Sequence, residues 1–376
     1  MLEQKSLRIA VVVNSAWNIY NYRLGLIEAL LAQGYSVWAI APTDDFVPQI
    51  EATGCQFIPL QRLSRKGTNP IQDLRLTHEL YRIYRDQEID IALQYTIKPN
   101  IYGSFACRFV KTKGVCTVTG LGYSFLSNGV VNKVVKRLYK QAFKRASLVA
   151  FQNNDDLKLF NDLKLLEEEK STLIKGSGIK TNYFKPLPKT ETTEDTVFLF
   201  VGRLLYDKGI VEYLEAAKAI KSKNPKTQFW IVGALDNDNP SAISPEIIDE
   251  YHKEGIINYI GQSSDVRSIM QNSDIVVLPS YREGLPRVML EGLAMAKPLI
   301  TTDTAGCRET VKDGVNGYIV PIKDREALVE AMQRMLNLSL NEREKMGQEG
   351  RKMAIEEFDE QAIIQRYFDE IKKLSS

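Results

Sequence analysis

Two glutamates in the stretch 280–291, SYREGLPRVMLE, have a residue type and spacing suited to binding a sugar. The stretch follows the apolar run DIVVLP, and Pro286 stands where a helix would begin, a position where its missing N–H costs nothing. Gly284 lets backbone N–H groups approach an anion closely, and the helix dipole favours a phosphate. Glu283 in the loop can reach a sugar, while Glu291, further into the helix, can reach other hydroxyls of the ligand. Spacing alone leaves open that both carboxylates are solvated helix charges.

A second stretch, VGRLLYDKG at 201–209, places two cations in another loop. Gly202 allows a tight turn, and Arg203 and Lys208 would both project from the loop that follows an apolar strand. Two cations of this kind suit a diphosphate, with arginine acting as a fork and lysine as a point charge. They could also be ordinary surface charges of a loop between a strand and a helix.

The elements around these stretches alternate between strand and helix along the whole chain. Short β-branched runs such as LRIAVVVN and VFLFVGR are followed by segments with helical periodicity. This alternation predicts parallel sheets covered by helices, in two doubly wound α/β domains. A stretch rich in proline, threonine and charge, KPLPKTETTEDT at 185–196, is the best linker candidate. We therefore expect domains at 1–186 and 187–376, with a ligand cleft between them and a helix over 357–376 packing back toward the first.

The two motifs together resemble the family 4 glycosyltransferases, whose retaining members carry two glutamates separated by seven residues on two Rossmann-like domains, the GT-B fold. The similarity covers nearly the whole chain, with LPSYREGLP, TTDTAGCRE and DGVNGYIVP in the family's order. Further segments, QYTIKPNIYGSFA, TGLGYSF and IVGALDNDNPSAI, look most like bacterial transferases that act on polyprenyl-diphosphate-linked sugars.

The resemblance implies a role for each matching residue. Arg203 and Lys208 would hold the donor diphosphate, Glu291 the ribose hydroxyls, and Glu283 the transferred sugar and the positive charge developing near its anomeric carbon. The predicted donor site also includes the following backbone positions: Gly202, Gly233, Ile260, Gly284, Leu285, Pro286 and Arg287. Neutralising the leaving diphosphate in this way requires no metal. We expect no cofactor and no metal site, and we interpret Asp236 and Asp238 as loop caps.

One departure of the first half from the family bears on the mechanism. Many members have a histidine where this chain has Thr119, and the two histidines present, His78 and His252, are expected on helix surfaces. A front-face mechanism, in which the leaving phosphate deprotonates the acceptor, needs no such histidine. Around the predicted acceptor we place five residues: Asn18, Arg23, Thr119, Gly120 and Gly122. The aromatic residues near Asn18 could equally be the start of a packed helix.

Charge is nearly balanced overall, with 49 basic and 47 acidic residues, which argues against a dedicated nucleic-acid binder. Residues 1–186 nevertheless hold 25 basic and 16 acidic side chains, so an anionic partner would face the first half. The stretch 132–146 predicts a basic amphipathic helix that contacts anionic lipids of the inner membrane, although its apolar side could instead belong to the core. With no spanning segment or signal peptide evident, we expect a cytoplasmic protein, peripheral at that membrane's cytoplasmic face.

The resemblance, together with these residues, implies a retaining, metal-independent glycosyltransferase. Its donor would be a UDP-sugar, favouring N-acetylhexosamine, and its acceptor a polyprenyl-diphosphate-linked saccharide of bacterial N-glycan, O-antigen or capsule assembly. Two alternatives remain open: a sugar-nucleotide 2-epimerase, which would need acid and base groups on the sugar, and a non-catalytic sugar-nucleotide-binding protein on the same scaffold.

Overall fold

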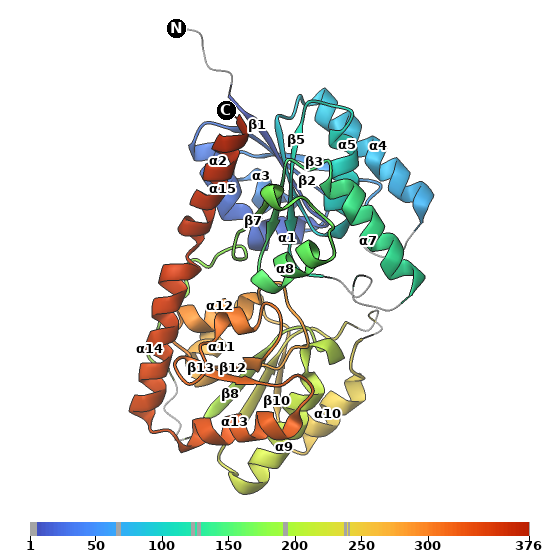
Figure 1. The fold of residues 1–376 in the computed structure, drawn as a ribbon. Coiled ribbons are helices and arrows are strands. Elements are labelled where there is room, and N and C mark those ends of the chain that lie inside the picture. Colours follow the sequence, from blue (N-terminus) through green and yellow to red (C-terminus); the bar gives the residue numbers. More distant parts are fainter. Residues whose placement is uncertain are drawn as a thin grey trace. The chain divides into compact units, whose positions relative to one another are not determined.

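The computed structural model describes residues 6–64, 69–121, 125, 129–190, 195–236, 239 and 241–375. The chain forms two compact units (Figure 1), one from Met1–Ser177 with Gln361–Ser376 and one from Gly178–Glu360. Each has a parallel sheet covered by helices, which confirms the predicted α/β class with two Rossmann-like doubly wound domains.

The first unit is built on a seven-stranded parallel sheet in the order β3-β2-β1-β4-β5-β6-β7. Its β-branched and apolar runs are buried on both faces, as a doubly wound sheet requires. The order reverses direction between β1 and β4, which is where ligands bind in such sheets. The strands are β1 (Arg8–Val12), β2 (Ser36–Ala41), β3 (Gln56–Pro59), β4 (Ile91–Tyr95), β5 (Lys113–Val118), β6 (Leu148–Phe151) and β7 (Ser171–Leu173).

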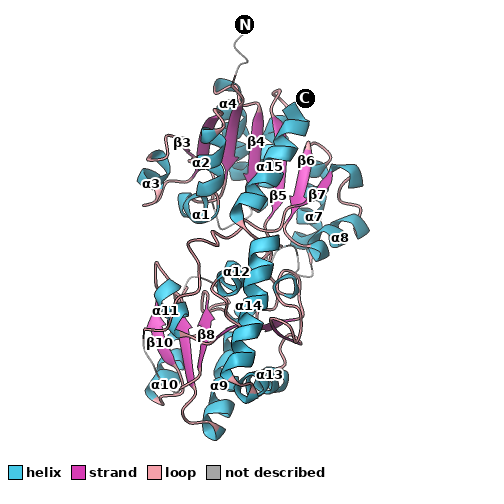
Figure 2. Cartoon of the chain, turned by 90° about the vertical axis from the view of Figure 1, so that its left-hand side faces the viewer, coloured by secondary structure: helices cyan, strands magenta, loops and turns pink. Residues whose placement is uncertain are grey.

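Helices cover both faces of this first sheet (Figure 2). Apolar side chains of α1, α2 and α15 pack on one face, and those of α4, α5, α7 and α8 pack on the other. The helices are α1 (Ala16–Tyr22), α2 (Leu24–Ala32), α3 (Val47–Glu51), α4 (Pro70–Asp86), the π-helix η1 (Pro99–Gly103), α5 (Ser104–Cys107), α7 (Val130–Phe143), α8 (Asn154–Asp162), the 3-10 helix η2 (Glu168–Lys170) and α15 (Glu360–Ser375).

The second unit repeats the pattern with a six-stranded parallel sheet in the order β10-β9-β8-β11-β12-β13. Here the order reverses between β8 and β11. The strands are β8 (Val197–Val201), β9 (Gln228–Val232), β10 (Asn258–Gly261), β11 (Ile275–Leu278), β12 (Leu299–Thr302) and β13 (Gly317–Val320). The helices are the 3-10 helix η3 (Tyr206–Lys208), α9 (Ile210–Lys223), α10 (Pro245–Lys253), α11 (Arg267–Asn272), α12 (Arg287–Ala294), the 3-10 helix η4 (Arg308–Thr310), α13 (Arg325–Asn337) and α14 (Leu340–Glu357).

The stretch 178–186, which we expected to end the first domain, lies in the second unit. Ile179 forms a parallel bridge with Asp359, and the Thr181 hydroxyl donates to the Asp359 carboxylate at 2.6 Å. The Arg351 guanidinium also donates to the Phe184 carbonyl at 3.3 Å. These bonds fix the stretch to the second unit, so the units divide before the proline-rich segment and not within it.

The final helix α15 belongs almost entirely to the first unit (Figure 2). Ile363, Ile364, Tyr367 and Ile371 are buried in the core cluster that also contains β1 and β2. The Tyr367 hydroxyl lies 3.3 Å from the Thr117 hydroxyl at the end of β5. The C-terminal segment therefore completes the core beneath the end of β5.

Candidate functional site

The two sequence motifs of the second unit meet at one edge of its sheet. β8 and β11 are neighbouring parallel strands, so the loops after Val201 and Leu278 leave the sheet side by side. The Tyr281 N–H donates to the Asp207 carbonyl at 2.9 Å. At Gly209, where φ is +70°, a Cβ atom would lie 2.0 Å from the Pro279 carbonyl oxygen. Glycine is required there because the two loops touch through their backbones.

Within this contact, Lys208 and Glu283 form an ion pair through Nζ and Oε1. The Ser280 hydroxyl donates to the same Glu283 oxygen at 2.8 Å. The two charged side chains are only 23% and 13% exposed. A pair this shielded from water interacts more strongly than a surface pair, so each side chain restricts the position of the other. Sequence reasoning missed Ser280 as a partner of Glu283, although it stands at the start of the motif.

The loop after β12 supports Glu283 from the other side. The Glu283 N–H donates to the Ala305 carbonyl at 3.1 Å, and the Thr304 hydroxyl donates to the Tyr281 carbonyl at 2.8 Å. Gly306 has a φ of +74°, and a Cβ there would lie 2.4 Å from the Gly284 carbonyl oxygen. The TTDTAGCRE segment thus positions the loop that carries Glu283 and Gly284.

Glu291 lies on α12, directly after this loop. Helix α12 begins at Arg287, with Pro286 as an extended N-cap, so the proline stands one residue earlier than predicted. The Arg287 Nε atom donates to Glu291 Oε1 at 3.0 Å, and Glu291 is only 8% exposed. Burial raises the pKa of the Glu291 carboxyl, although the Arg287 guanidinium acts in the opposite direction. Glu291 is therefore a buried, paired carboxylate and not the solvated helix charge that spacing alone allowed.

Arg203 projects from the loop after β8 and is mostly exposed. Its Nη1 atom lies 3.2 Å from the Asp236 carboxylate, with side-chain exposures of 57% and 32%. Asp236 also accepts a bond from the Asn239 side chain at 3.4 Å, consistent with the predicted loop cap. Its pairing with Arg203 was not predicted, because the two residues are 33 positions apart. Asp238 lies outside the described residues.

The remaining predicted donor positions mark successive strand ends of the same sheet. Gly202 follows β8 and Gly233 follows β9, and a Cβ at Gly233 would lie 1.7 Å from the Gly202 carbonyl oxygen. The Gly233 N–H donates to the Gly261 carbonyl at 2.9 Å, and Ile260 of β10 is 39% exposed. Leu285 is half-buried against the core beside α12. These positions share the edge that carries Arg203, Lys208 and Glu283.

The predicted acceptor residues lie in the first unit. Asn18 is half-buried in α1, and its N–H donates to the Ser15 hydroxyl that caps the helix. Arg23 is buried at the junction of α1 and α2. Thr119 and Gly120 follow β5, and Gly120 has a φ of +126°. Gly122 lies outside the described residues. No hydrogen bond among the described residues joins Asn18 to Thr119 or Gly120.

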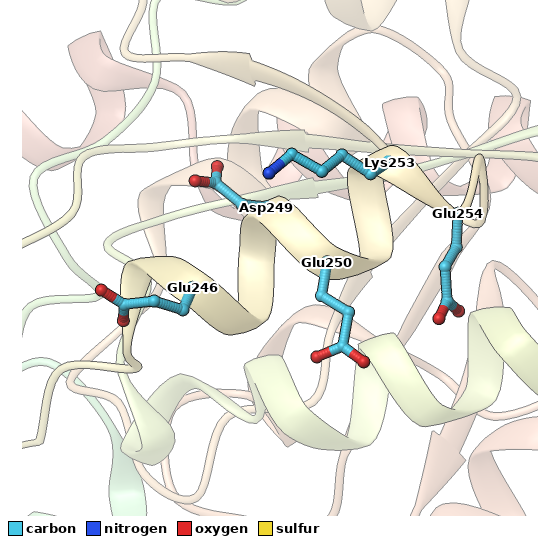
Figure 3. Close-up of a pocket in the computed structure, with 5 residues that line it drawn as sticks. All are labelled: Glu246, Asp249, Glu250, Lys253 and Glu254. Atoms are coloured by element: carbon cyan, nitrogen blue, oxygen red, sulfur yellow. The ribbon is translucent and has the colours of Figure 1, made fainter.

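Other candidate features lie away from these residues. Both histidines are exposed, His78 on α4 and His252 on α10, as expected. Figure 3 shows a pocket along α10 with Lys253 pointing toward Asp249. It is lined by Glu246, Asp249, Glu250, Lys253 and Glu254, none of which was a predicted site residue. In the described part of the chain, no three His, Cys, Asp or Glu side chains are grouped as a metal site would need.

The comparisons with known proteins agree with this arrangement. The family model described as glycosyl transferases group 1 matches residues 183–353, and that described as glycosyl transferase 4-like matches residues 8–153. The N,N'-diacetylbacillosaminyl-diphospho-undecaprenol alpha-1,3-N-acetylgalactosaminyltransferase of Campylobacter jejuni is 30% identical, over 96% of this chain and 97% of its own. The UDP-Gal:alpha-D-GlcNAc-diphosphoundecaprenol alpha-1,3-galactosyltransferase of Escherichia coli is 26% identical, over 70% of this chain and 71% of its own.

Solved structures show the same fold. The Anabaena protein HepE in complex with UDP-glucose superposes with a TM-score of 0.79 at 17% identity, covering 98% of this chain and 100% of that chain. Sucrose-phosphate synthase from Thermosynechococcus elongatus superposes with a TM-score of 0.81 at 20% identity, covering 98% and 99%. With both family models matched and a full-length relative at 30% identity, the chain belongs to the family 4 glycosyltransferases of the GT-B fold.

Proposed function

We propose that this glycosyltransferase moves a sugar from a UDP-sugar to a polyprenyl-diphosphate-linked saccharide, with retention of the anomeric configuration and without a metal ion. The ion pair between Lys208 and Glu283, at the point where strand order reverses in the second sheet, carries the proposal. It brings a cation suited to a diphosphate next to a carboxylate suited to a sugar.

Each group at this edge would act on a different part of the donor. Lys208 and Arg203 would bind the diphosphate and stabilise its charge as the bond to the sugar breaks. The amino terminus of α12 would add its dipole to the same phosphates. Glu283 would lie near the anomeric carbon, where positive charge develops, while the buried Glu291 would accept bonds from the ribose hydroxyls. In a front-face mechanism, the departing phosphate oxygen would take the proton of the acceptor hydroxyl.

The names of the relatives support the identity of the substrates. Both transferases named above act, by name, on sugars linked to diphospho-undecaprenol, and the full-length relative transfers N-acetylgalactosamine. The E. coli enzyme takes UDP-Gal as donor. We infer that this chain uses a UDP-N-acetylhexosamine and a lipid-linked saccharide in the assembly of a bacterial glycan.

A lipid-linked acceptor also requires the enzyme to reach a membrane surface, and we assign that contact to α7. Its cations Lys133, Arg137 and Lys140 are exposed, together with Val131 and Val134. The apolar positions with helical spacing, Val135, Leu138, Ala142 and Phe143, pack in the core, so contact would depend mainly on charge. No helix in the described chain has the length and hydropathy to span a bilayer.

The decisive experiment measures release of nucleoside diphosphate from UDP-, GDP- and ADP-sugars in EDTA, with and without a detergent-solubilised polyprenyl-diphosphate monosaccharide. We expect UDP release that depends on the acceptor, and a product whose anomeric proton coupling by NMR matches that of the donor. Donor isomerisation without acceptor would instead identify an epimerase, and binding without turnover a non-catalytic protein. An inverted product, or activity abolished by EDTA, would refute the proposed mechanism.

A further inference from the structure

Arg23 is a buried cation that has no acidic partner among the described residues of the first unit. The residue is only 4% exposed, and its Nε atom has no hydrogen-bond partner among the described residues. Among the described residues, the Arg23 guanidinium forms no ion pair with any carboxylate. A buried charge of this kind is strongly destabilising unless it is paired.

The guanidinium of Arg23 stacks on an aromatic ring. The Arg23 Cζ atom lies 3.9 Å from the centre of the Tyr95 ring, at the end of β4. Such stacking holds the guanidinium plane in place, but it leaves the in-plane N–H donors without acceptors. The stack therefore holds the guanidinium N–H donors of Arg23 in a fixed position at the carboxyl edge of the first sheet.

Further unpartnered polar atoms lie at the same edge. β1 pairs with β4 in a register that aligns Val12 with Gln94, so the residues that follow, Asn14 and Thr96, leave neighbouring strands. The Asn14 Oδ1 and Thr96 Oγ1 atoms are buried, and neither has a partner in the described structure. β1 and β4 are the two strands between which the sheet order reverses. This is the position where doubly wound sheets bind their ligands.

The backbone at Thr96 is also strained. Its φ is +70°, a left-handed conformation that is costly for a β-branched residue. The Thr96 carbonyl accepts from the Asn100 N–H at 3.1 Å, at the beginning of the π-helix η1. The fold thus maintains an unfavourable conformation beside an unpaired cation, at the sheet's ligand-binding position.

We propose that Arg23, with Asn14 and Thr96, forms a subsite for a phosphoryl group of the glycosyl acceptor. A phosphate supplies anionic oxygens that can accept hydrogen bonds from the Arg23 guanidinium. The hydroxyl or amide groups of an attached sugar can form hydrogen bonds with Asn14 and Thr96. The choice of the acceptor rests on the proposed function, in which the second unit binds the donor diphosphate. The first unit then selects lipid-linked substrates by their diphosphate as well as by their sugar.

Arg23→Met tests this subsite, because methionine keeps an apolar chain on Tyr95 but cannot bind an anion. Transfer would be measured to two acceptors with the same sugar, one linked through a diphosphate to a short polyprenyl chain and one linked to an uncharged alkyl chain. We expect kcat/KM for the diphosphate acceptor to fall by about 10- to 100-fold, and that for the uncharged acceptor by less than about threefold. Arg23→Lys, which retains the charge, should recover part of the loss.

Two controls separate binding from folding. Arg8→Gln removes another arginine near an aromatic ring, 5.8 Å from the centre of Trp38, but one that pairs with Glu88 at 3.0 Å. It should leave acceptor selectivity unchanged. Thermal unfolding of Arg23→Met should occur at or above the wild-type temperature, because the variant removes an unpaired buried charge. If Arg23→Met lowered kcat/KM equally for the diphosphate and the uncharged acceptor, or changed neither, the proposed subsite would be wrong.

Further measurements distinguish the source of the anion. If Arg23→Met weakened binding of UDP while acceptor selectivity persisted, the anion would belong to the donor, and the assignment to the acceptor would be wrong. If the wild-type enzyme used no diphosphate acceptor, the proposed function would fail independently.

Calorimetry with inorganic pyrophosphate would then test the subsite, in a Lys208→Met background that weakens the predicted donor site. Binding that Arg23→Met removes and Arg8→Gln retains would support it, and absence of binding would refute it.

Discussion

Lys208 and Glu283, from loops that follow two neighbouring strands, form an ion pair in which both side chains are largely shielded from water. The Ser280 hydroxyl binds the same Glu283 oxygen, so the carboxylate has a defined position before any ligand arrives. A donor diphosphate would compete with Glu283 for the lysine. Lys208 would then interact with the phosphates while remaining near the carboxylate that we propose binds the sugar, and this would couple binding of the diphosphate to placement of the sugar.

Lys208→Met should lower kcat by about 100-fold or more, because it removes the cation that we propose stabilises the leaving diphosphate. Steady-state UDP release at saturating donor would measure the effect. Lys218→Met is the matched control, since Lys218 pairs with Glu254 at 3.6 Å on an exposed surface of the same unit. A Lys208→Met enzyme with near-wild-type turnover would remove Lys208 from the mechanism.

Gly306→Ala should reduce activity by more than about tenfold, because the new methyl group would displace the backbone that carries Glu283 and Gly284. Gly314→Ala provides the control: its φ of +73° imposes a similar backbone strain, but a Cβ there contacts nothing within 4 Å. Gly314→Ala should lose about 1 kcal/mol of unfolding free energy through backbone strain, and Gly306→Ala should lose more, because its methyl group also overlaps backbone atoms. Denaturant unfolding and kinetics measured together would separate the two effects, and equal activity in both variants would contradict the role of Gly306.

The alternation of strand and helix was sufficient to predict the fold class, because buried parallel strands have a distinctive apolar pattern. It also predicted that the loops after β8 and β11 lie at one sheet edge. It did not predict the pairing of Arg203 with Asp236 or the stacking of Arg23 on Tyr95. Those contacts join residues far apart in sequence, and their geometry depends on side-chain packing that periodicity does not encode.

Helix α7 shows a second limit of sequence reasoning. The spacing of its apolar residues predicted an amphipathic helix but could not distinguish core packing from lipid contact; these residues are Val134, Val135, Leu138, Ala142 and Phe143. Ala142 and Phe143 are buried in the core and Val135 and Leu138 pack against it, whereas Val134 is 49% exposed. Similarly, the composition of 185–196 indicated a linker, whereas Lys189 in fact pairs with Asp274 at 2.8 Å.

Glu291→Gln should change how stability depends on pH. Burial raises the pKa of the Glu291 carboxyl above its ordinary value of 4.5, so the folded state binds this proton more tightly than the unfolded state does. Protonation of Glu291 therefore stabilises the folded wild-type protein at low pH. This contribution to the free energy of unfolding is lost as pH rises from about 4.5 through the raised pKa. Unfolding free energies from pH 4 to 8 should fall less steeply in Glu291→Gln. If the unfolding free energies of the wild type and Glu291→Gln changed with pH in parallel, Glu291 would not be the source of this pH dependence.

Charge reversal on α7 should weaken binding to anionic membranes. The triple variant Lys133→Glu, Arg137→Glu, Lys140→Glu removes three exposed cations, each contributing about 1 kcal/mol at an anionic surface. Co-sedimentation with vesicles containing phosphatidylglycerol should fall by at least about tenfold, and the difference should shrink in high salt. The control reverses three exposed lysines of the second unit, Lys218, Lys253 and Lys345. An equal loss in that control would indicate an effect of net charge and not of α7.

Thr96→Gly should stabilise the protein while impairing it as an enzyme. Glycine accepts the φ of +70° without steric cost, so the free energy of unfolding should rise by up to about 1 kcal/mol. The lost hydroxyl should lower kcat/KM for the lipid-linked acceptor by about three- to tenfold. Lys164→Gly, at another left-handed position of the same unit with a φ of +52°, should give a similar gain in stability with unchanged activity. If Thr96→Gly also left activity unchanged, the strain at Thr96 would have no part in acceptor binding, and the subsite would be reduced to Arg23 and Asn14.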